Sequence, residues 1–364
     1  MFLTLRTFSS TGGIEKVCKI FAKSLSDIQR EDPGFDFKVF SLYDKNSDID
    51  NKYLDSKYFT GFAENKWRFF YQLYRESTQA DLIVLSHVNI LPAFYLLKCL
   101  NRKPVFYLFA HGIELWNVLT ATKKNMLRHC QKFLSVSQYT AKLIETKQGI
   151  GINRINIFPN CLDPFLSRRQ SEKSEKLMAR YSFKKEDIVL LTLTRLSSTE
   201  YYKGYDHVLN CLNRIVKYYP DCKYLIVGNY DLQEKMRIDR IIEEQGLQSR
   251  VVMTGYIDDQ ELEEHYRLAD LYVMPSKKEG FGIVFIEAMF YGLPVIAGNK
   301  DGSPQALLGG ELGILIDPDS EDELVESILN VLEKPASFKP DQQLLQANFG
   351  YDKYLKRVKA LLAE

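Results

Sequence analysis

The sequence predicts an α/β protein with two doubly wound parallel sheets, one in each half of the chain. Short β-branched and aromatic runs alternate with amphipathic segments, which is the pattern of parallel strands covered by helices on both faces. The alternation stops once, in a polar and charged stretch near the middle, and then resumes. A chain of 364 residues is also long enough to divide into two domains of ordinary size.

The predicted strands fall into two series, separated by the polar stretch. The first series is Phe2–Leu5, Phe37–Phe40, Leu82–Leu85, Val105–Phe109 and Phe133–Val136. The second series is Ile188–Thr194, Tyr224–Val227, Val251–Thr254, Leu271–Val273 and Val295–Ala297. Because ligands bind beyond the carboxyl ends of the strands in such sheets, we expect the two sheets to face each other across one cleft.

The domain boundaries follow from these series. We predict a first domain over residues 1–165, a linker over 166–186 and a second domain over 187–345. Residues 346–364 are predicted to form a C-terminal helix that packs back on the first domain, since their apolar residues have helical spacing.

Composition limits the class of protein. Apolar residues make up 45% of the chain and charged residues 26%, enough to fill real cores. The six cysteines have no C-x-x-C spacing, which argues against a zinc site or a disulfide framework. The first apolar run ends at Arg6, too early for a signal peptide, so we expect a cytoplasmic protein without a nucleic-acid partner.

Charge is distributed unevenly along the chain. Residues 1–180 contain 27 Lys and Arg against 17 Asp and Glu, although the net charge of the whole chain is only +1. This excess suggests that the first half meets an anionic partner, and a chance distribution over solvated faces fits equally well. The basic, aromatic stretch 66–75 gives one hypothesis: peripheral contact with the inner face of a membrane. The alternative is a helix that packs these aromatics on its own domain.

The segment 275–298, PSKKEGFGIVFIEAMFYGLPVIAG, has the strongest signal for a binding site. Glu279 and Gly282 lie in a loop after a predicted strand, and a helix is expected to open near Ile283. Unpaired N–H groups at a helix start favour an anion such as a diphosphate. Glu287 would lie roughly 6 Å further along the helix, within reach of a ribose. The alternative is a polar turn and a solvated helix residue, which the apolar neighbours of Glu287 argue against.

Three further elements fit the same chemistry. Gly12 and Gly13 form a glycine turn between the first strand and its helix, suited to a phosphate or sugar, although such a pair is more often a simple turn. Arg195 and Lys203 follow the first strand of the second domain and can place two cations beside a diphosphate. His111 ends a buried strand, where a histidine is usually structural.

An E-x7-E motif and seven further motifs in order resemble the retaining glycosyltransferases of family 4, in the GT-B class. Glu279 and Glu287 match the E-x7-E motif of that family. The other motifs are GGIEKV (12–17), AHGIELW (110–116), SVSQYT (135–140), PNCLD (159–163), RLSSTEYYKGYD (195–206), VMTGYIDDQEL (252–262) and DGSPQALLGGELGILIDPD (301–319). Two departures are Gln305, where the family usually has glutamate, and the sequence 228–231, GNYD, in place of G-x-G.

The resemblance implies an activity and a role for each residue. The enzyme would transfer a hexose from UDP or GDP to a glycan or lipid-linked acceptor, with retention of configuration and without a metal or other cofactor. Glu279 would hold the sugar hydroxyls, Glu287 the ribose, and Arg195 with Lys203 the diphosphate. The remaining assignments are His111 as a catalytic residue beside the sugar, Gly12, Gly13, Gly282 and Ile283 as donor-binding residues, and Glu114 with Trp116 on the acceptor side. A nucleotide-sugar epimerase and a catalytically silent donor-binding protein are the alternatives.

Overall fold

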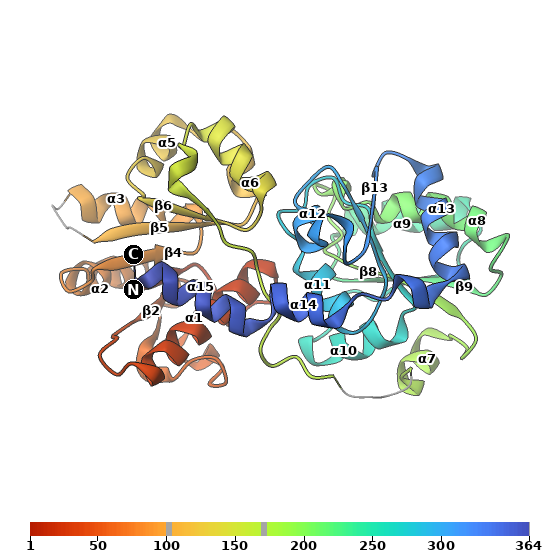
Figure 1. Ribbon diagram of the computed structural model, residues 1–364, viewed down its shortest axis with the longest axis horizontal. Coiled ribbons are helices and arrows are strands. Elements are labelled where there is room, and N and C mark those ends of the chain that lie inside the picture. The colour runs from red at the N-terminus through yellow and green to blue at the C-terminus, as the bar shows by residue number, and fades with distance from the viewer. Residues whose placement is uncertain (100–103, 169–172, 364) are drawn as a thin grey trace. The chain divides into compact units, whose positions relative to one another are not determined.

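Two parallel sheets organise the protein (Figure 1). The structure is a computed structural model that describes residues 1–99, 104–168 and 173–363. The chain divides into two units: Met1–Pro164 with Gly350–Glu364, and Phe165–Phe349. Each unit is described separately below.

The sheet of the first unit has seven parallel strands in the order β3-β2-β1-β4-β5-β6-β7. They are β1 (Phe2–Thr4), β2 (Val39–Ser41), β3 (Phe59–Gly61), β4 (Leu82–Leu85), β5 (Val105–Ala110), β6 (Lys132–Ser135) and β7 (Ile155–Ile157). The sequence predicted all of these except β3 and β7. Both are three-residue strands at the edges of the sheet.

Seven α-helices belong to the described part of the first unit. They are α1 (Gly13–Glu31), α2 (Lys66–Glu76), α3 (Leu91–Cys99), α4 (Ile113–Trp116), α5 (Ala121–Leu127), α6 (Gln138–Leu143) and α15 (Tyr351–Leu362). Helix α1 packs on the sheet because its apolar side chains recur at helical spacing, and the ring centroid of Phe21 lies 4.8 Å from that of Phe2 and 5.1 Å from that of Phe109. Among the described helices of either unit, none is both long and apolar enough to cross a membrane.

The second sheet has six parallel strands in the order β10-β9-β8-β11-β12-β13. They are β8 (Ile188–Leu193), β9 (Cys222–Val227), β10 (Val251–Met253), β11 (Leu271–Met274), β12 (Val295–Gly298) and β13 (Ile314–Ile316). Strand β11 is buried along its whole length, as its unbroken apolar run requires for a sheet covered on both faces. Only β13, again a short edge strand, was absent from the prediction.

The helices around this sheet are α7 (Glu175–Tyr181), α8 (Tyr205–Val216), α9 (Leu232–Glu244), α10 (Asp259–Leu268), α11 (Ile283–Phe290), α12 (Ser303–Ala306), α13 (Glu321–Glu333) and α14 (Gln342–Phe349). Helix α7 lies within the segment 166–186 that was predicted as the linker, and residues 169–172 are outside the described part. Leu177 of α7 is fully buried, and Arg180 pairs with Glu261 of α10 at 2.9 Å. A single apolar face among many charges gave too weak a signal for a helix.

The predicted C-terminal segment 346–364 contains a break between two helices. Gly350 separates α14 from α15, and the two helices belong to different units. In α14, the ring of Phe349 packs on that of Phe281 in the second unit, with centroids 5.6 Å apart. In α15, the Tyr351 hydroxyl donates to Asp27 of α1 at 2.7 Å, so this helix packs on the first unit.

Candidate active site

The predicted site residues follow the strands at which each sheet reverses its strand order. In the first sheet the reversal lies between β1 and β4, and in the second between β8 and β11. Ligands bind outside the carboxyl ends of strands at such points. Gly12 and Gly13 follow β1, Arg195 follows β8, and Glu279 follows β11.

An ion pair joins Glu279 to Lys203 in the second unit. The Lys203 Nζ lies 2.6 Å from a carboxylate oxygen of Glu279, and these side chains are only 15% and 19% exposed. Gly204, the next residue, has φ +80°, and a side chain there would place its Cβ 2.4 Å from the Pro275 carbonyl oxygen. The structure therefore brings together two residues that the sequence separates by 76 positions.

We call residues 275–282 the donor loop. It leads from β11 into α11, whose first residue is Ile283, as predicted. Gly282 caps this helix with φ +85°, a conformation that other residues rarely adopt. A Cβ at this position would also lie 2.3 Å from the ring of Phe285. The fold thus requires glycine here, whether or not a ligand approaches it.

Glu287 is buried in the second turn of α11. Its side chain is almost completely enclosed, and the Tyr266 hydroxyl of α10 donates a hydrogen bond of 3.0 Å to one of its carboxylate oxygens. The interpretation of Glu287 as an ordinary solvated residue is therefore wrong. Its contact with a ribose stays a prediction.

Arg195 lies in the loop after β8, and its guanidinium forms an ion pair with Glu200. The Arg195 side chain is 68% exposed, whereas that of Glu200 is only 16% exposed. Both cations assigned to the diphosphate, Arg195 and Lys203, thus hold carboxylates in this structure. Sequence reasoning did not single out Glu200, although its position five residues after Arg195 in the same motif was a signal.

Asp231, in the unusual sequence 228–231, fixes the loop that contains Glu200. One of its carboxylate oxygens accepts the Ser198 N–H at 2.7 Å, and the other accepts the Glu234 N–H at 2.8 Å, so Asp231 also caps α9. These backbone hydrogen bonds lower the pKa of Asp231. Gly228 has φ +140°, and a Cβ there would lie 1.9 Å from the Thr194 carbonyl oxygen.

In the first unit, Gly12 and Gly13 begin α1. Gly12 has an extended backbone that any residue adopts, and a Cβ on Gly13 would meet no atom within 4 Å. A Cβ on Gly12 would lie 2.5 Å from a carboxylate oxygen of Glu15, at the end of a side chain that can move, and the space beside Gly13 is open. The preceding loop is held by Asp44, a fully buried carboxylate that accepts the Thr7 N–H at 2.7 Å and the Ser9 N–H at 3.1 Å.

His111 follows β5 and is held in one orientation. Its Nε2 lies 2.8 Å from the Ser86 carbonyl oxygen, so this nitrogen must carry the proton and donate. Burial lowers the pKa of His111 to about 4, which keeps the ring neutral near pH 7. His87, which sequence reasoning did not consider as a site residue, follows β4 in the same way, and its pKa is also lowered by burial.

Glu114 and Trp116 have structural contacts in the first unit. A Glu114 oxygen accepts the backbone N–H of His111 at 2.6 Å and that of Gly112 at 3.1 Å. Burial raises the pKa of Glu114. Trp116 is buried and donates to Thr140 at 3.3 Å. These contacts hold His111 and the core, and the suggestion that the two residues shape the acceptor side stays a prediction.

A metal site has no support among the described residues, which contain no cluster of three or more His, Cys, Asp or Glu side chains able to hold an ion. Asp317 and Asp319 have D-x-D spacing, but both pair with Lys300, at 2.6 and 2.7 Å. Metal independence remains a prediction.

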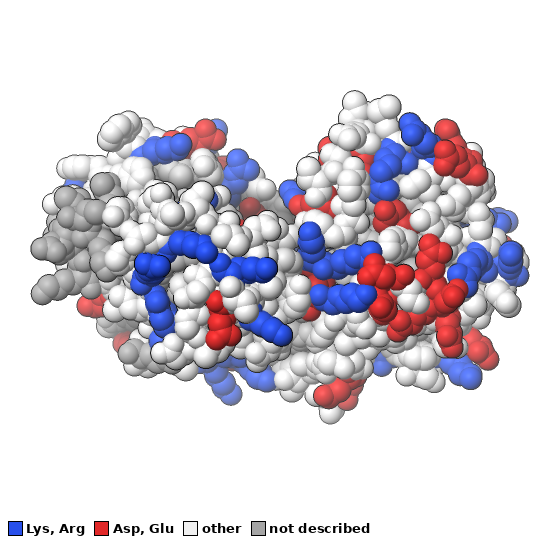
Figure 2. Space-filling view, turned by 90° about the horizontal axis from the view of Figure 1, so that it is seen from above, with Lys and Arg blue, Asp and Glu red and all other residues white. Residues whose placement is uncertain are grey.

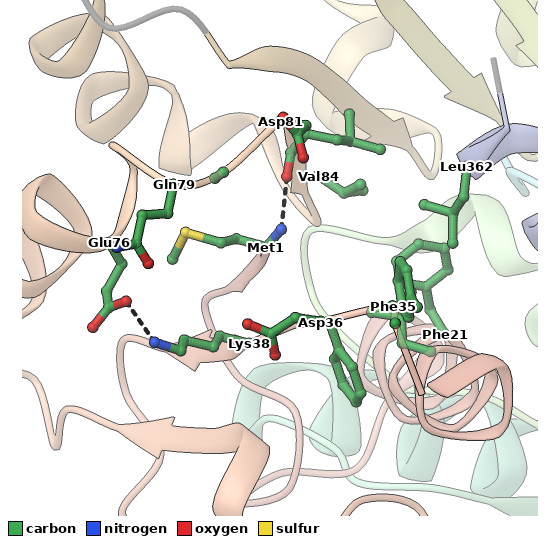
Figure 3. Close-up of a pocket in the computed structure, with 15 residues that line it drawn as sticks. Met1, Phe21, Phe35, Asp36, Lys38, Glu76, Gln79, Asp81, Val84 and Leu362 are labelled. Atoms are coloured by element: carbon green, nitrogen blue, oxygen red, sulfur yellow. Dashed lines mark hydrogen bonds and ion pairs between the residues drawn. The ribbon is translucent and has the colours of Figure 1, made fainter. Parts of the chain in front are cut away.

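A cavity of about 370 Å³ lies at the amino ends of the strands of the first sheet (Figure 3). Its lining includes Met1, Lys38 and Leu82, which precede or begin β1, β2 and β4 at their amino ends. An ion pair of 2.5 Å between Lys38 and Glu76 lies along its wall (Figure 3). Because the predicted site residues follow the carboxyl ends of the strands, this cavity is separate from the candidate site.

Comparison with known proteins finds a matching family model for the second unit. The family model described as glycosyl transferases group 1 matches residues 173–349, which include Lys203, Glu279 and Glu287. This match covers slightly less than half of the 364 residues, so it is the second unit that is similar to this family. A relative from Mycolicibacterium smegmatis, the GDP-mannose-dependent alpha-(1-6)-phosphatidylinositol monomannoside mannosyltransferase, is 27% identical over 236 residues. That match covers 62% of this chain and only 60% of the relative. Mannosylfructose-phosphate synthase of Agrobacterium fabrum is 29% identical over 54% of this chain and 44% of its own length.

Solved structures share the fold of the whole chain. Anabaena Alr3699/HepE in complex with UDP has a TM-score of 0.80, with 18% identity, and the match covers 100% of this chain and 98% of that one. Sucrose-phosphate synthase from Thermosynechococcus elongatus has a TM-score of 0.77 with 19% identity, covering 100% and 98%. The protein therefore has the GT-B fold.

Proposed function

We propose that this protein is a retaining hexosyltransferase that uses a UDP- or GDP-sugar and a glycan or lipid-linked acceptor. The observation that carries the proposal is the arrangement of Glu279 and Glu287 on either side of the start of α11, with Lys203 paired to Glu279 at 2.6 Å. This arrangement lies inside the segment that matches the group 1 family. In this proposal the second unit binds the nucleotide sugar, and the first unit binds the acceptor.

The proposed reaction breaks the bond between the anomeric carbon and the diphosphate oxygen. The acceptor oxygen attacks the same face of the sugar, so configuration is retained, and its proton passes to an oxygen of the departing diphosphate. Arg195 and Lys203 stabilise the charge that grows on that diphosphate. Glu279 holds the sugar hydroxyls and Glu287 the ribose. His111, neutral because its pKa is about 4, offers a hydrogen bond rather than a positive charge.

The donor is best identified by its effect on thermal stability. One relative is named as GDP-mannose-dependent, whereas Anabaena HepE is described in complexes with UDP and with UDP-glucose. A ligand that binds only the folded protein raises the free energy of unfolding by mass action, by about 2.7 kcal/mol at a hundredfold excess over Kd. Tm rises with it. We expect UDP or GDP to raise Tm. No response to either nucleotide or to their sugars would contradict the proposal.

Turnover then separates transfer from the two alternatives. With the donor that raises Tm and a mixture of glycans and lipid-linked sugars, we expect release of nucleotide diphosphate that depends on the acceptor. An epimerase would instead convert the donor sugar without any acceptor, and a silent binding protein would bind the donor and release nothing.

Helix α2 supports an acceptor at a membrane surface. Trp67, Tyr71 and Tyr74, spaced to lie on one face, are 87%, 64% and 39% exposed. The alternative, packing on the protein's own domain, applies to Phe69 and Leu73, which are buried on the other face. On the face that Figure 2 shows, Lys and Arg outnumber Asp and Glu on the first unit, whereas the second unit carries both kinds of charge, with a cluster of Asp and Glu. We propose that α2 rests on an anionic membrane, with its exposed aromatics at the interface.

Vesicle binding tests the role of α2. Replacing both Arg68 and Arg75 with glutamine should weaken partitioning onto anionic vesicles roughly 30-fold, because each basic residue contributes about 1 kcal/mol near such a surface. Trp67→Ala should also weaken it, whereas Tyr218→Ala, at a tyrosine 70% exposed in the second unit, should not. Failure of the wild type to bind anionic vesicles at low salt would end this part of the proposal without affecting the assignment of the donor site.

A further inference from the structure

The backbone of Glu279 is held from both sides by the loop after β12. The Glu279 N–H donates to a carboxylate oxygen of Asp301 at 2.6 Å, and the Glu279 carbonyl accepts the Gly302 N–H at 2.7 Å. The second oxygen of Asp301 accepts the Ser303 N–H at 2.8 Å. Asp301 is 4% exposed, so its carboxylate is directed inward at these two N–H groups rather than at solvent.

The contact between the two loops leaves no room for adjustment. A Cβ on Gly302 would lie 2.1 Å from the Gly280 carbonyl oxygen and 2.7 Å from that of Glu279. On its other side, the donor loop is fixed by Lys203 and by the Lys277 N–H, which donates to the Tyr202 carbonyl at 2.8 Å. Asp301 and Gly302 therefore bind the backbone of Glu279, and Lys203 binds its carboxylate.

We propose that Asp301 is a positioning residue for transfer, which fixes the backbone of Glu279 so that its carboxylate meets the transferring sugar. This inference rests on the proposed function, because it assigns Asp301 to the sugar-binding role of Glu279. In the loop after β12, the side chain of Asp301 binds the Glu279 backbone, whereas Gly302 contributes only its own N–H. A charged acceptor makes shorter and stronger bonds to backbone N–H groups than a neutral one.

Asp301 holds this place at a cost to stability. Burial, with a smaller contribution from the negative charge of Glu279, raises the pKa of Asp301 to about 7. Because the folded state retains the proton that the unfolded state has lost, folding stability falls as pH rises from about 4 to about 7. An amide at position 301 does not titrate and so avoids this pH-dependent loss, although its single oxygen leaves one of the two N–H groups without an acceptor. The effect of Asp301→Asn on Tm should therefore become more favourable with rising pH.

The other charges near Asp301 are already paired. Lys203 holds Glu279, and the adjacent Lys300 holds Asp317 and Asp319. We therefore assign a difference near pH 7 between wild type and Asp301→Asn to position 301.

The test measures kcat, nucleotide affinity and Tm for Asp301→Asn. We expect kcat to fall about tenfold or more, Kd for the nucleotide diphosphate to stay within about threefold, and the effect on Tm to be more favourable at pH 8 than at pH 5. A residue that merely supported the fold would also weaken nucleotide binding. Asp187→Asn is the matched control, because Asp187 is also 4% exposed and accepts the Lys184 N–H at 2.8 Å. Asp187 precedes β8, at the amino end of that strand.

A double variant decides whether Asp301 acts through Glu279. In a Glu279→Gln background, Asp301→Asn should lower kcat by less than about twofold more, because the two changes disable one function. Additive losses, or unchanged kcat in Asp301→Asn while Glu279→Gln is impaired, would overturn the inference and leave the proposed function intact. A wild type without transferase activity would instead contradict the proposed function.

Discussion

The two glutamates of the donor loop and α11 should respond differently to the same substitution. Glu287→Gln leaves one acceptor oxygen in place of a carboxylate, and the Tyr266 hydroxyl already donates to that group. A ribose hydroxyl would then lose its charged acceptor. Hydrogen bonds to charged groups contribute about 1.5–3 kcal/mol, so we expect Kd for the nucleotide diphosphate to rise roughly ten- to hundredfold.

Glu279→Gln should leave that affinity nearly intact and lower kcat, because the Glu279 carboxylate is assigned to the sugar rather than to the nucleotide. Its partner Lys203 stays in place and loses a competing carboxylate 2.6 Å away, which favours the diphosphate slightly. Isothermal titration calorimetry with UDP and GDP, followed by initial rates with the full donor, separates the two effects.

Glu323→Gln is the matched control for this comparison. Glu323 lies on α13 of the same unit and accepts the Asp317 N–H at 2.9 Å, so its substitution changes charge and one backbone contact outside the donor loop. It should alter neither Kd nor kcat. Equal loss of nucleotide affinity in folded Glu279→Gln and Glu287→Gln would mean that the two roles are wrongly assigned, and no loss in either would remove α11 from the donor site.

Three further predictions follow from the described contacts. Excess EDTA should leave turnover unchanged, since Arg195 and Lys203 supply the positive charge; a loss that magnesium or manganese restores would contradict this. Glu200→Gln should tighten nucleotide diphosphate binding up to about fivefold, because Arg195 no longer has to break its ion pair with Glu200, and exposed ion pairs contribute at most about 1 kcal/mol. Weaker binding in titrations would show that Glu200 itself contacts the donor. Lowering the pH from 6.5 to 4 should reduce the unfolding free energy of the wild type by up to about 3 kcal/mol through His111, because the folded pKa of this residue is below its unfolded value. In denaturant melts, the unfolding free energy of His111→Gln should fall less over this range.

The sequence predicted the fold through the strands that lie inside each sheet. Central strands such as β8 and β11 are covered on both faces, so their apolar runs are continuous and their ends are nearly as predicted. The three strands that it did not predict, β3, β7 and β13, are edge strands of three residues. Helix α7 was also missed, because its charged residues make ion pairs with α10 that no local pattern reveals.

The candidate site was predicted from motifs that are continuous in sequence. Glu279, Gly282, Ile283 and Glu287 lie within nine residues, and a glycine loop before a helix has a physical signature. Pairings across the fold could not be predicted. The contact of Lys203 with Glu279 spans 76 positions, and that of Asp301 with the Glu279 backbone spans 22. These depend on how β8, β11 and β12 are ordered in the sheet.

Acidic side chains hold four of the loops at the carboxyl edges of the two sheets. Asp44 accepts N–H groups of the loop after β1, Glu114 those after β5, Asp231 one after β8, and Asp301 those beside the donor loop and α12. In the sequence alone, such loop-holding carboxylates look the same as catalytic ones, and the sequence analysis considered only catalytic and binding roles. A carboxylate has two oxygens with several acceptor positions, so one side chain can fix two or more N–H groups of a loop that has no strand partner. Loops fixed in this way keep their geometry before any donor arrives, and less ordering of the protein then opposes donor binding.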